Sequence, residues 1–442
     1  MHLADVHLDT PFVSRDEALR RRLQESVREA FGRAVDLALE NRAHALLIAG
    51  DLFDNNRLTF NTEKFLVEQL SRLNEAGIKV YYATGNHDPG RGNYRAHRIP
   101  WPPNVYLFTD AFPRTYAVTD RDGEVVGYVT GAGHATPAES ANIAAMFPPE
   151  PSCVEDNGSR AGSQRGSCYA CHVGLLHTWV ETARGGETHD RYAPCTPLDL
   201  AKKGYRYWAL GHIHGRQQVL DEPQAHYPGN IQGRSPRETG PKGALLIEVD
   251  ESGVLRAEFC PLSPVIWGTM TLEDLTRVDS LFSLHDVIMM EFDRLLSGYR
   301  IATSPRAASP DAEWILRIIL KGRCPIYRDL SDEDNLEALR EEVADLTGAL
   351  HVEIKVESLY RAVRWEDYAE GPHVLASLVS LMEQAKRDDD LLDRIASEYL
   401  SASGIAGLEP KATAEERRRY LRELLDGLED EAVARMVVDD AS

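Results

Sequence analysis

The sequence has 442 residues, 43% of them hydrophobic, which is enough for two or three domains of roughly 150 residues with buried cores. The formal net charge of −21 excludes a generally basic surface and argues against a partner held by bulk electrostatics, such as nucleic acid. No apolar stretch approaches the ~20 residues of a transmembrane helix, and the first residues lack the basic and apolar regions of a signal peptide, so a cytoplasmic protein is expected.

The N-terminal part alternates between helical and strand patterns. Apolar residues recur at helix spacing over 19–41 and again over 65–77. Continuous apolar runs at 45–49 and 80–84 are typical of strands that are buried on both faces. The order of strand, helix, strand, helix and strand predicts a layered α/β sheet.

The middle of the chain has a stronger β character. Clustered Pro, Ser, Gly and Asn residues at 148–166 predict an exposed loop. Short apolar runs bounded by turn residues predict further strands at 105–108, 115–118, 125–129, 172–176 and 205–210.

Beyond Pro261 the pattern changes to that of a small α+β domain. A partly helical stretch at 278–296 is followed by a loop of mainly small and polar residues at 297–310. The remaining signals are a strand at 314–320, a helix-capping motif at 331–334 and an alternating strand at 350–356.

From Glu366 onward the chain is helical, with a helix that opens at Gly371-Pro372 and a capping box at Thr413 to Glu416. Three domains are therefore expected, at residues 1–262, 263–362 and 363–442.

Six cysteines are scattered through the chain without the regular framework of a disulfide-rich domain, so free thiols are the preferred interpretation. A structural zinc site is the weaker alternative, because the spacing of its ligands matches no standard zinc ribbon. It would use Cys153, Cys168, Cys171 and Cys195.

Polar side chains follow four of the predicted strands and the short apolar pair Leu3-Ala4. They are Asp5 and His7, Asp51, Asn86 with His87, His177, and His212 with His214. In an open α/β sheet, functional residues gather outside the carboxyl ends of the strands. Carboxylate, amide and imidazole ligands without thiolates suit manganese, iron or zinc, and the set is too large for one ion. Two ions that share a carboxylate form the clamp used for displacement at phosphorus.

These residues also carry a resemblance. Asp5-x-His7, Gly50-Asp51, Gly85-Asn86-His87-Asp88, His177 and Gly211-His212-Ile213-His214 resemble, in the same order, the signature blocks of the calcineurin-like metallophosphoesterase superfamily. The segments 4–9, 50–54 and 227–230 further resemble the SbcD-type DNA repair exonuclease branch, particularly its YhaO-like members. The resemblance covers residues 1–260 well and implies two mixed sheets flanked by helices, with a first strand shorter than is usual in the family.

The resemblance implies a role for each matching residue. Asp5, His7 and His214 would hold one metal ion, Asn86, His177 and His212 the other, and Asp51 would bridge them, with a metal-bridging hydroxide attacking phosphorus. His87 would protonate or stabilise the leaving oxygen, and Asp88 would orient His87. His134 and His172, although also near strand ends, are expected to be bystanders.

The function implied is a manganese-dependent 3′–5′ DNA exonuclease, with iron or zinc as alternative metals. The α+β domain would restrict which DNA enters, and the C-terminal helices would dock an ATPase subunit of the SbcC or YhaN type, with a homodimer also considered. The alternatives are a phosphodiesterase or phosphatase acting on a small molecule or phosphoprotein, and a non-catalytic scaffold, which the complete ligand set disfavours.

The acidity of the chain conflicts with a DNA substrate, because DNA affinity comes chiefly from neutralised phosphates. Two metal ions and local basic residues would have to supply the positive path. The candidates are Arg91, Arg95, Arg98, Arg216, Arg234, Arg237 and Lys242.

Overall fold

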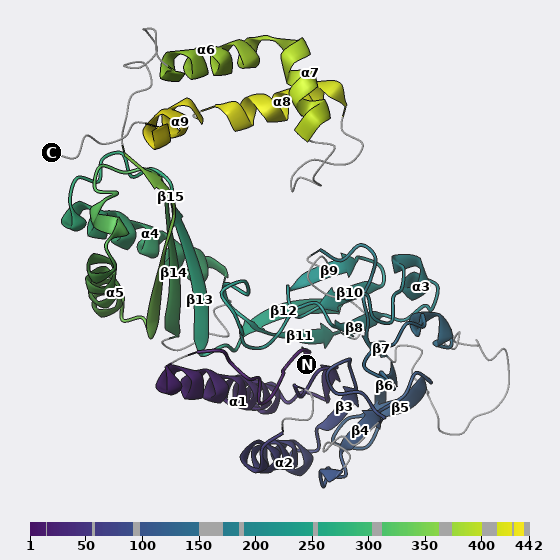
Figure 1. Ribbon diagram of the computed structural model, residues 1–442. Coiled ribbons are helices and arrows are strands. Elements are labelled where there is room, and N and C mark those ends of the chain that lie inside the picture. Colours follow the sequence, from purple (N-terminus) through teal and green to yellow (C-terminus); the bar gives the residue numbers. More distant parts are fainter. Residues whose placement is uncertain are drawn as a thin grey trace. The chain divides into compact units, whose positions relative to one another are not determined.

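A computed structural model describes residues 1–14, 16–54, 58–91, 98–149, 171–184, 190–250, 255–302, 312–361, 374–399, 413–426 and 428–436 (Figure 1). The chain forms two compact units. Unit 1 comprises residues 1–268 and 295–315, and unit 2 comprises residues 269–294 and 316–442.

Unit 1 contains two six-stranded sheets. The first has the order β12-β11-β1-β2-β3-β4, in which β1 to β4 pair in parallel and β11 pairs antiparallel with both β1 and β12. Its strands are β1 (His2–Leu3), β2 (Ala45–Ala49), β3 (Lys79–Ala83), β4 (Val105–Phe108), β11 (Gly243–Val249) and β12 (Leu255–Pro261).

The second sheet has the order β5-β6-β7-β8-β10-β9, with a parallel centre and antiparallel edges. Both sheets are therefore mixed, as predicted. Its strands are β5 (Arg114–Thr119), β6 (Val125–Ala132), β7 (Cys171–His177), β8 (Tyr207–Gly211), β9 (Gln217–Leu220) and β10 (Gln224–Tyr227).

The two sheets pack face to face over a shared apolar cluster, in which Tyr81 and Phe108 of the first sheet are buried with Leu175 and Tyr207 of the second. Side chains buried on both faces explain the continuous apolar runs in the sequence. The predicted layered sandwich is confirmed.

Helices cover the outer faces of the sandwich. α1 (Glu17–Glu40) and α2 (Phe60–Glu75) share a buried cluster with the outward-facing residues of the first sheet. Asp16 caps α1 by accepting hydrogen bonds from the amides of Ala18 and Leu19. On the second sheet, a separate cluster lies beside α3 (Pro197–Ala201) and the short helix η2 (Ala144–Met146).

A third sheet, of order β13-β14-β15, is formed by β13 (Val265–Leu272), β14 (Glu313–Arg323) and β15 (His351–Tyr360). Its companion helix α5 (Glu333–Thr347) begins at the predicted capping motif, where Asp332 accepts from two backbone amides.

Helix α4 (Leu281–Ala302) is longer than predicted, because residues 297–302 are helical where a loop was expected. Tyr299 packs edge-on against Trp314 at 5.6 Å between ring centroids. This contact is tertiary, so the small and polar composition of the segment did not reveal it.

The C-terminal region is helical, as predicted, with α6 (Val374–Arg387), α7 (Asp389–Tyr399), α8 (Ala414–Leu425) and α9 (Leu428–Met436). The capping box of Thr413 and Glu416 is present at the start of α8. Across the described residues, no helix combines the length and apolar character needed to span a membrane.

Some predictions fall outside the described residues, namely most of the loop at 148–166 and the helix start at Gly371-Pro372. Cys153 and Cys168 of the alternative zinc site also lie outside, whereas Cys171 and Cys195 are free thiols.

Candidate metal centre

The carboxyl ends of β1, β2, β3, β7 and β8 meet at one edge of the sandwich. The loops after β1 and β2 are joined by hydrogen bonds from the amide of Asp5 to the carbonyl of Gly50, at 3.2 Å, and from His7 to Asp51, at 2.9 Å. The amide of His212 donates to both carboxylate oxygens of Asp5, at 3.1 Å each, and so ties the second sheet to the first. Side chains that are far apart in sequence are thereby brought together.

The backbone at this edge is strained. Four of the eight non-glycine residues with positive φ in the described parts are predicted metal ligands, namely Asp5, His7, Asp51 and His212. Such conformations cost about 1–3 kcal/mol each and persist where the surrounding structure holds them. The strain turns these short loops so that their side chains face a common centre.

Two glycines of the sequence motifs allow the ligands to approach. A Cβ atom at Gly85 would lie 2.2 Å from Oδ1 of Asp51, and one at Gly50 would lie 2.2 Å from Nδ1 of His177. Any side chain at these positions would displace a predicted ligand. The glycines are therefore part of the geometry of the centre.

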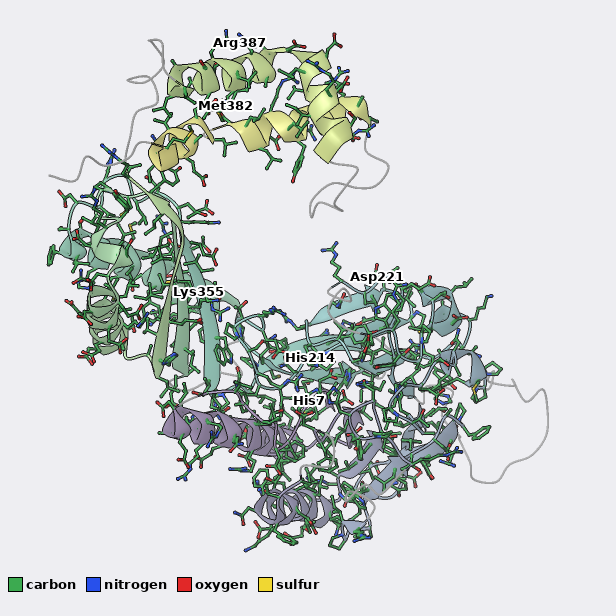
Figure 2. The ribbon with its side chains drawn as sticks, in the orientation of Figure 1. His7, His214, Asp221, Lys355, Met382 and Arg387 are labelled. Atoms are coloured by element: carbon green, nitrogen blue, oxygen red, sulfur yellow. The ribbon has the colours of Figure 1, made fainter. Side chains whose placement is uncertain are left out.

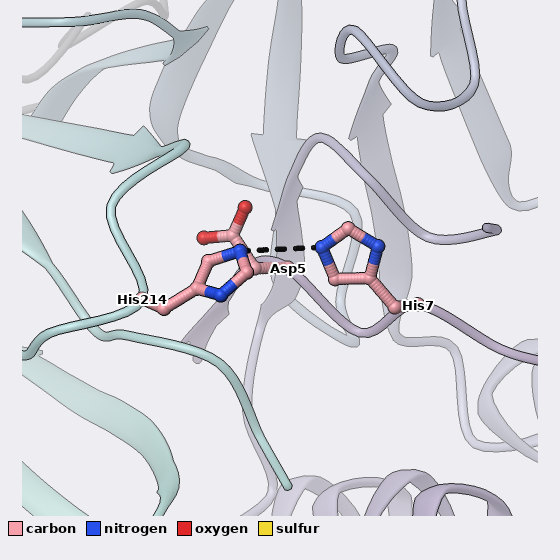
Figure 3. A group of neighbouring side chains, drawn as sticks. All are labelled: Asp5, His7 and His214. Carbon is pink, nitrogen blue, oxygen red and sulfur yellow. Dashed lines mark hydrogen bonds between the residues drawn. The ribbon is translucent and has the colours of Figure 1, made fainter. Parts of the chain in front are cut away.

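The first ligand group consists of Asp5, His7 and His214 (Figure 3). Nε2 of His7 lies 3.3 Å from Nε2 of His214, and one ligand atom from each of the three residues lies within 4.8 Å of the others. Figure 2 shows His7 and His214 among the side chains of unit 1. All three side chains are buried.

The second group consists of Asn86, His177 and His212. The outer ring nitrogens donate to backbone carbonyls: Nδ1 of His177 to Ala49, at 2.9 Å, and Nε2 of His212 to Asp190, at 2.8 Å. The remaining nitrogens then carry lone pairs, and they lie 2.9 Å (His177) and 3.2 Å (His212) from Oδ1 of Asn86. Three lone-pair atoms that converge in this way are the arrangement that a cation stabilises.

Asp51 lies between the two groups. Its Oδ2 is 3.7 Å from Nε2 of His7 and 3.5 Å from Nε2 of His177. Burial, and then the charges of Asp88 and Asp5, raise the pKa of Asp51 well above its ordinary value, and burial raises the pKa of Asp5 to about 8. Buried carboxylates without a cation are unfavourable as anions, so this donor set fits two divalent ions.

His87 lies beside the first group, and its ring packs edge-on against that of His7 at 4.7 Å. Its Nδ1 is 2.8 Å from Oδ1 of Asp54, and a third of its side chain (33%) is exposed. His87 is therefore more accessible than the buried side chains of the first group.

The expectation that Asp88 orients His87 is not what the structure shows. The carboxylate of Asp88 accepts hydrogen bonds from the amides of Gly85, Asp51, Leu52 and Phe53 and from the hydroxyl of Tyr82, at 2.5–3.3 Å. It fixes the two loops, while Asp54 takes the position beside His87. The family resemblance implied that role for Asp88, but the peptide geometry turns its side chain toward the backbone.

Glu238 was not identified from the sequence. Its Oε1 is 2.7 Å from Nδ1 of His214, and its Oε2 accepts from the amide of Arg234 at 2.6 Å. Burial would raise the pKa of Glu238, but the hydrogen bond from His214 and the charges of His214 and Arg234 lower it to about 2. A carboxylate that supports a histidine of another loop follows no periodic spacing, so only the folded chain reveals it.

His134 and His172 occupy structural positions. Nε2 of His134 is 2.7 Å from the carbonyl of His177, and His172 contacts the hydroxyl of Thr130 and stacks on Tyr205. Neither belongs to a ligand group among the described residues. Of the basic residues proposed for a DNA path, Arg95 lies outside the described residues and Arg234 lies at the centre itself.

The comparisons with known proteins agree with this geometry. A family model described as calcineurin-like phosphoesterase matches residues 1–216. The uncharacterized metallophosphoesterase YhaO of Bacillus subtilis is 33% identical over 78% of each chain. The DNA double-strand break repair protein Mre11 of Aeropyrum pernix is 26% identical over 97% of this chain and 95% of its own. The Mre11 protein of Methanopyrus kandleri is 27% identical over 58% of this chain and 55% of its own. With these sequence matches, and with clustered histidine and carboxylate side chains at the strand ends, the chain belongs to the calcineurin-like metallophosphoesterases.

Proposed function

We propose that this protein is a dinuclear-metal-dependent phosphodiester hydrolase that acts as a 3′–5′ exonuclease in DNA repair, with manganese as its metal. One observation carries the dinuclear site: Oδ2 of Asp51 lies 3.7 Å from His7 and 3.5 Å from His177, so one carboxylate serves both ligand groups. The Mre11 relatives, which are named as DNA double-strand break repair proteins, support DNA as the substrate.

In this proposal the two ligand groups hold one ion each, and Asp51 is shared. Two divalent ions bound there would neutralise charge on the phosphoryl oxygens and lower the pKa of a water molecule for attack on phosphorus. The outer-sphere contacts support this assignment, because the second nitrogen of His177, His212 and His214 donates to a carbonyl or carboxylate.

The protein's own acid is His87. The carboxylate of Asp54 holds its Nδ1–H, which leaves Nε2 to donate a proton to, or stabilise, the departing oxygen. Burial would raise the pKa of Asp54, but the hydrogen bond from His87 and the charge of Arg234 lower it, so Asp54 is an anion that keeps the imidazole in one orientation. Asp88 acts on the loop rather than on the proton.

We assign hydrolysis to residues 1–262 and the selection of DNA to residues 263–362. The helices of 363–442 would dock an ATPase subunit of the SbcC or YhaN type. The protein is proposed to be cytoplasmic and to form homodimers as well. Apolar side chains on these helices support the docking assignment, because Val374, Leu381 and Leu424 are exposed.

The test is hydrolysis of 3′- and 5′-labelled duplex DNA in manganese, beside hydrolysis of bis(p-nitrophenyl) phosphate, with His87→Ala as control. Shortening from the 3′ end by the wild type alone is expected. Cleavage of the small diester without cleavage of DNA would favour the alternative of a small-molecule or phosphoprotein substrate, which the net charge of −21 supports. Cleavage of neither substrate in manganese, iron or zinc would overturn the hydrolase assignment.

A further inference from the structure

Arg234 lies against the first ligand group. Its charge lowers the pKa of Asp54 and Glu238, but no contact described above uses its forked N–H groups. It belongs to the segment between β10 and β11, and 19% of its side chain is exposed. One terminal nitrogen is 3.8 Å from Oδ2 of Asp54, and the other is 3.5 Å from Nδ1 of His214. Its Nε is buried and has no hydrogen-bond partner among the described residues.

The contact between Arg234 and His214 is not a hydrogen bond. Nδ1 of His214 lies 2.7 Å from Oε1 of Glu238, much closer than its 3.5 Å from Arg234, so Nδ1 directs its hydrogen to that carboxylate oxygen. A nitrogen that already donates a hydrogen has no lone pair for the guanidinium. Among the described residues, the Nε–H of Arg234 therefore has no acceptor although the side chain is largely buried, which is unfavourable.

The position is also unfavourable for metal binding. A guanidinium is permanently charged, and here it faces the histidines of the first ligand group, where it repels any cation held by them. Its ion pair with Asp54 is long, at 3.8 Å, and its Nε has no acceptor among the described residues, so the guanidinium can take a further anionic partner.

Asp54 relates Arg234 to the proposed proton donor. Its Oδ1 contacts His87 at 2.8 Å, and its Oδ2 faces Arg234 at 3.8 Å. The two side chains thus flank one carboxylate beside the ligand group. The forked N–H groups of arginine match the oxygens of a phosphoryl group, and such charge-assisted pairs are strong.

We propose that Arg234 binds the non-bridging oxygens of the substrate's phosphoryl group, next to His87. The proposal rests on the proposed function, since it presumes a phosphoester in the site. Its ligand class is a tetrahedral phosphorus oxyanion, whether part of a nucleic acid, a small ester or free phosphate.

The experiment compares Arg234→Gln and Arg234→Lys with the wild type. Arg121→Gln is the matched control, because Arg121 is an exposed residue in the turn between β5 and β6 and its replacement makes the same change of charge. Calorimetry measures manganese affinity first, and then inorganic phosphate affinity of the manganese-loaded protein. Thermal unfolding and the KM for bis(p-nitrophenyl) phosphate complete the comparison.

We expect Arg234→Gln to weaken phosphate binding and raise the KM by roughly tenfold or more, while manganese affinity stays the same or increases. Arg234→Lys should recover part of the phosphate affinity, and Arg121→Gln should match the wild type. Unchanged phosphate affinity in Arg234→Gln would overturn the proposal. A fall in manganese affinity as large as the fall in phosphate affinity would also overturn it, by showing a structural role.

If Arg234→Gln does not fold, Arg234→Lys provides the test, because lysine keeps the positive charge but lacks the forked N–H groups of arginine. A phosphate affinity equal to that of the wild type in Arg234→Lys would overturn the proposal. Phosphate binding is measured without turnover, so failure of the two proposals can be told apart. An inactive wild type whose phosphate binding still depends on Arg234 contradicts only the proposed function. An active wild type with phosphate binding independent of Arg234 contradicts only this inference.

Discussion

The imidazole of His87 is hydrogen-bonded to Asp54, with 2.8 Å between Nδ1 and Oδ1. The carboxylates of Asp54 and Asp88 thus have separate tasks. Asp54 contacts the His87 ring, whereas Asp88 accepts hydrogen bonds from backbone amides of the loops after β2 and β3. A dyad formed across two loops holds the ring in place only while both loops are fixed. Catalysis and loop stability should therefore respond to different substitutions.

Asp54→Asn should lower kcat by roughly 10- to 100-fold, because the ring of His87 loses the anion that sets its orientation. Steady-state hydrolysis of a small diester in manganese measures the effect, and metal analysis should still find two ions per chain. An unchanged kcat would show that Asp54 does not orient His87.

Asp88→Ala should act on stability. Removing the carboxylate leaves the amides of Gly85, Asp51 and Leu52 without their acceptor in a buried position, which should lower the free energy of unfolding by about 3 kcal/mol. Denaturant unfolding of the metal-free protein measures this difference, with Asp122→Ala in an exposed turn as control. A loss no greater than that of the control would contradict the assignment.

His87→Ala and Asn86→Ala should separate metal binding from turnover. The first should abolish turnover and leave two ions bound, because His87 is held by Asp54 rather than placed in either proposed metal shell. The second should weaken one of the two sites, since Oδ1 of Asn86 meets both His177 and His212. Calorimetric titration with manganese distinguishes the two results, and equal metal losses in both variants would refute the division of labour.

Metal binding should release protons. Burial raises the pKa of Asp5 to about 8, so the metal-free protein holds a proton there at neutral pH that a divalent ion must displace. Manganese affinity should therefore fall as the pH is lowered from 8 to 6. Because Asp5 keeps in the folded state a proton that the unfolded state has released, the contribution of Asp5 to the stability of the metal-free protein should fall as the pH rises from 4 to 8. Calorimetry in buffers of different ionisation enthalpy tests the release of protons, and a manganese affinity independent of pH would contradict it. Thermal unfolding against pH tests the contribution of Asp5 to stability.

The regular elements of the sandwich could be predicted because their signals are local. The continuous apolar run at Ala45 to Ala49 reflects a strand buried on both faces, and the structure has β2 there. The helical spacing of Leu23, Val27 and Phe31 reflects a helix buried on one face, and the structure has α1 there. The end of α4 could not be predicted, because it depends on a ring contact between Tyr299 and Trp314.

The candidate metal centre could likewise be predicted only in part. The position of ligand types at strand ends indicated a metal site, and the resemblance supplied the individual roles. Asp54, Glu238 and Arg234 act through contacts that cross from one loop to another, so their spacing in the sequence carries no period. Distances of this kind become visible only when both sheets are in place.

The pairing of His7 with His214 joins positions 207 residues apart. The first ligand group therefore cannot exist until nearly all of the sandwich has been synthesised and its two sheets have docked. Contacts of such long range form late in folding, because the closure of the intervening chain must be offset by other contacts first. A metal ion cannot act here as an early template, and its uptake would instead report that the sandwich is complete.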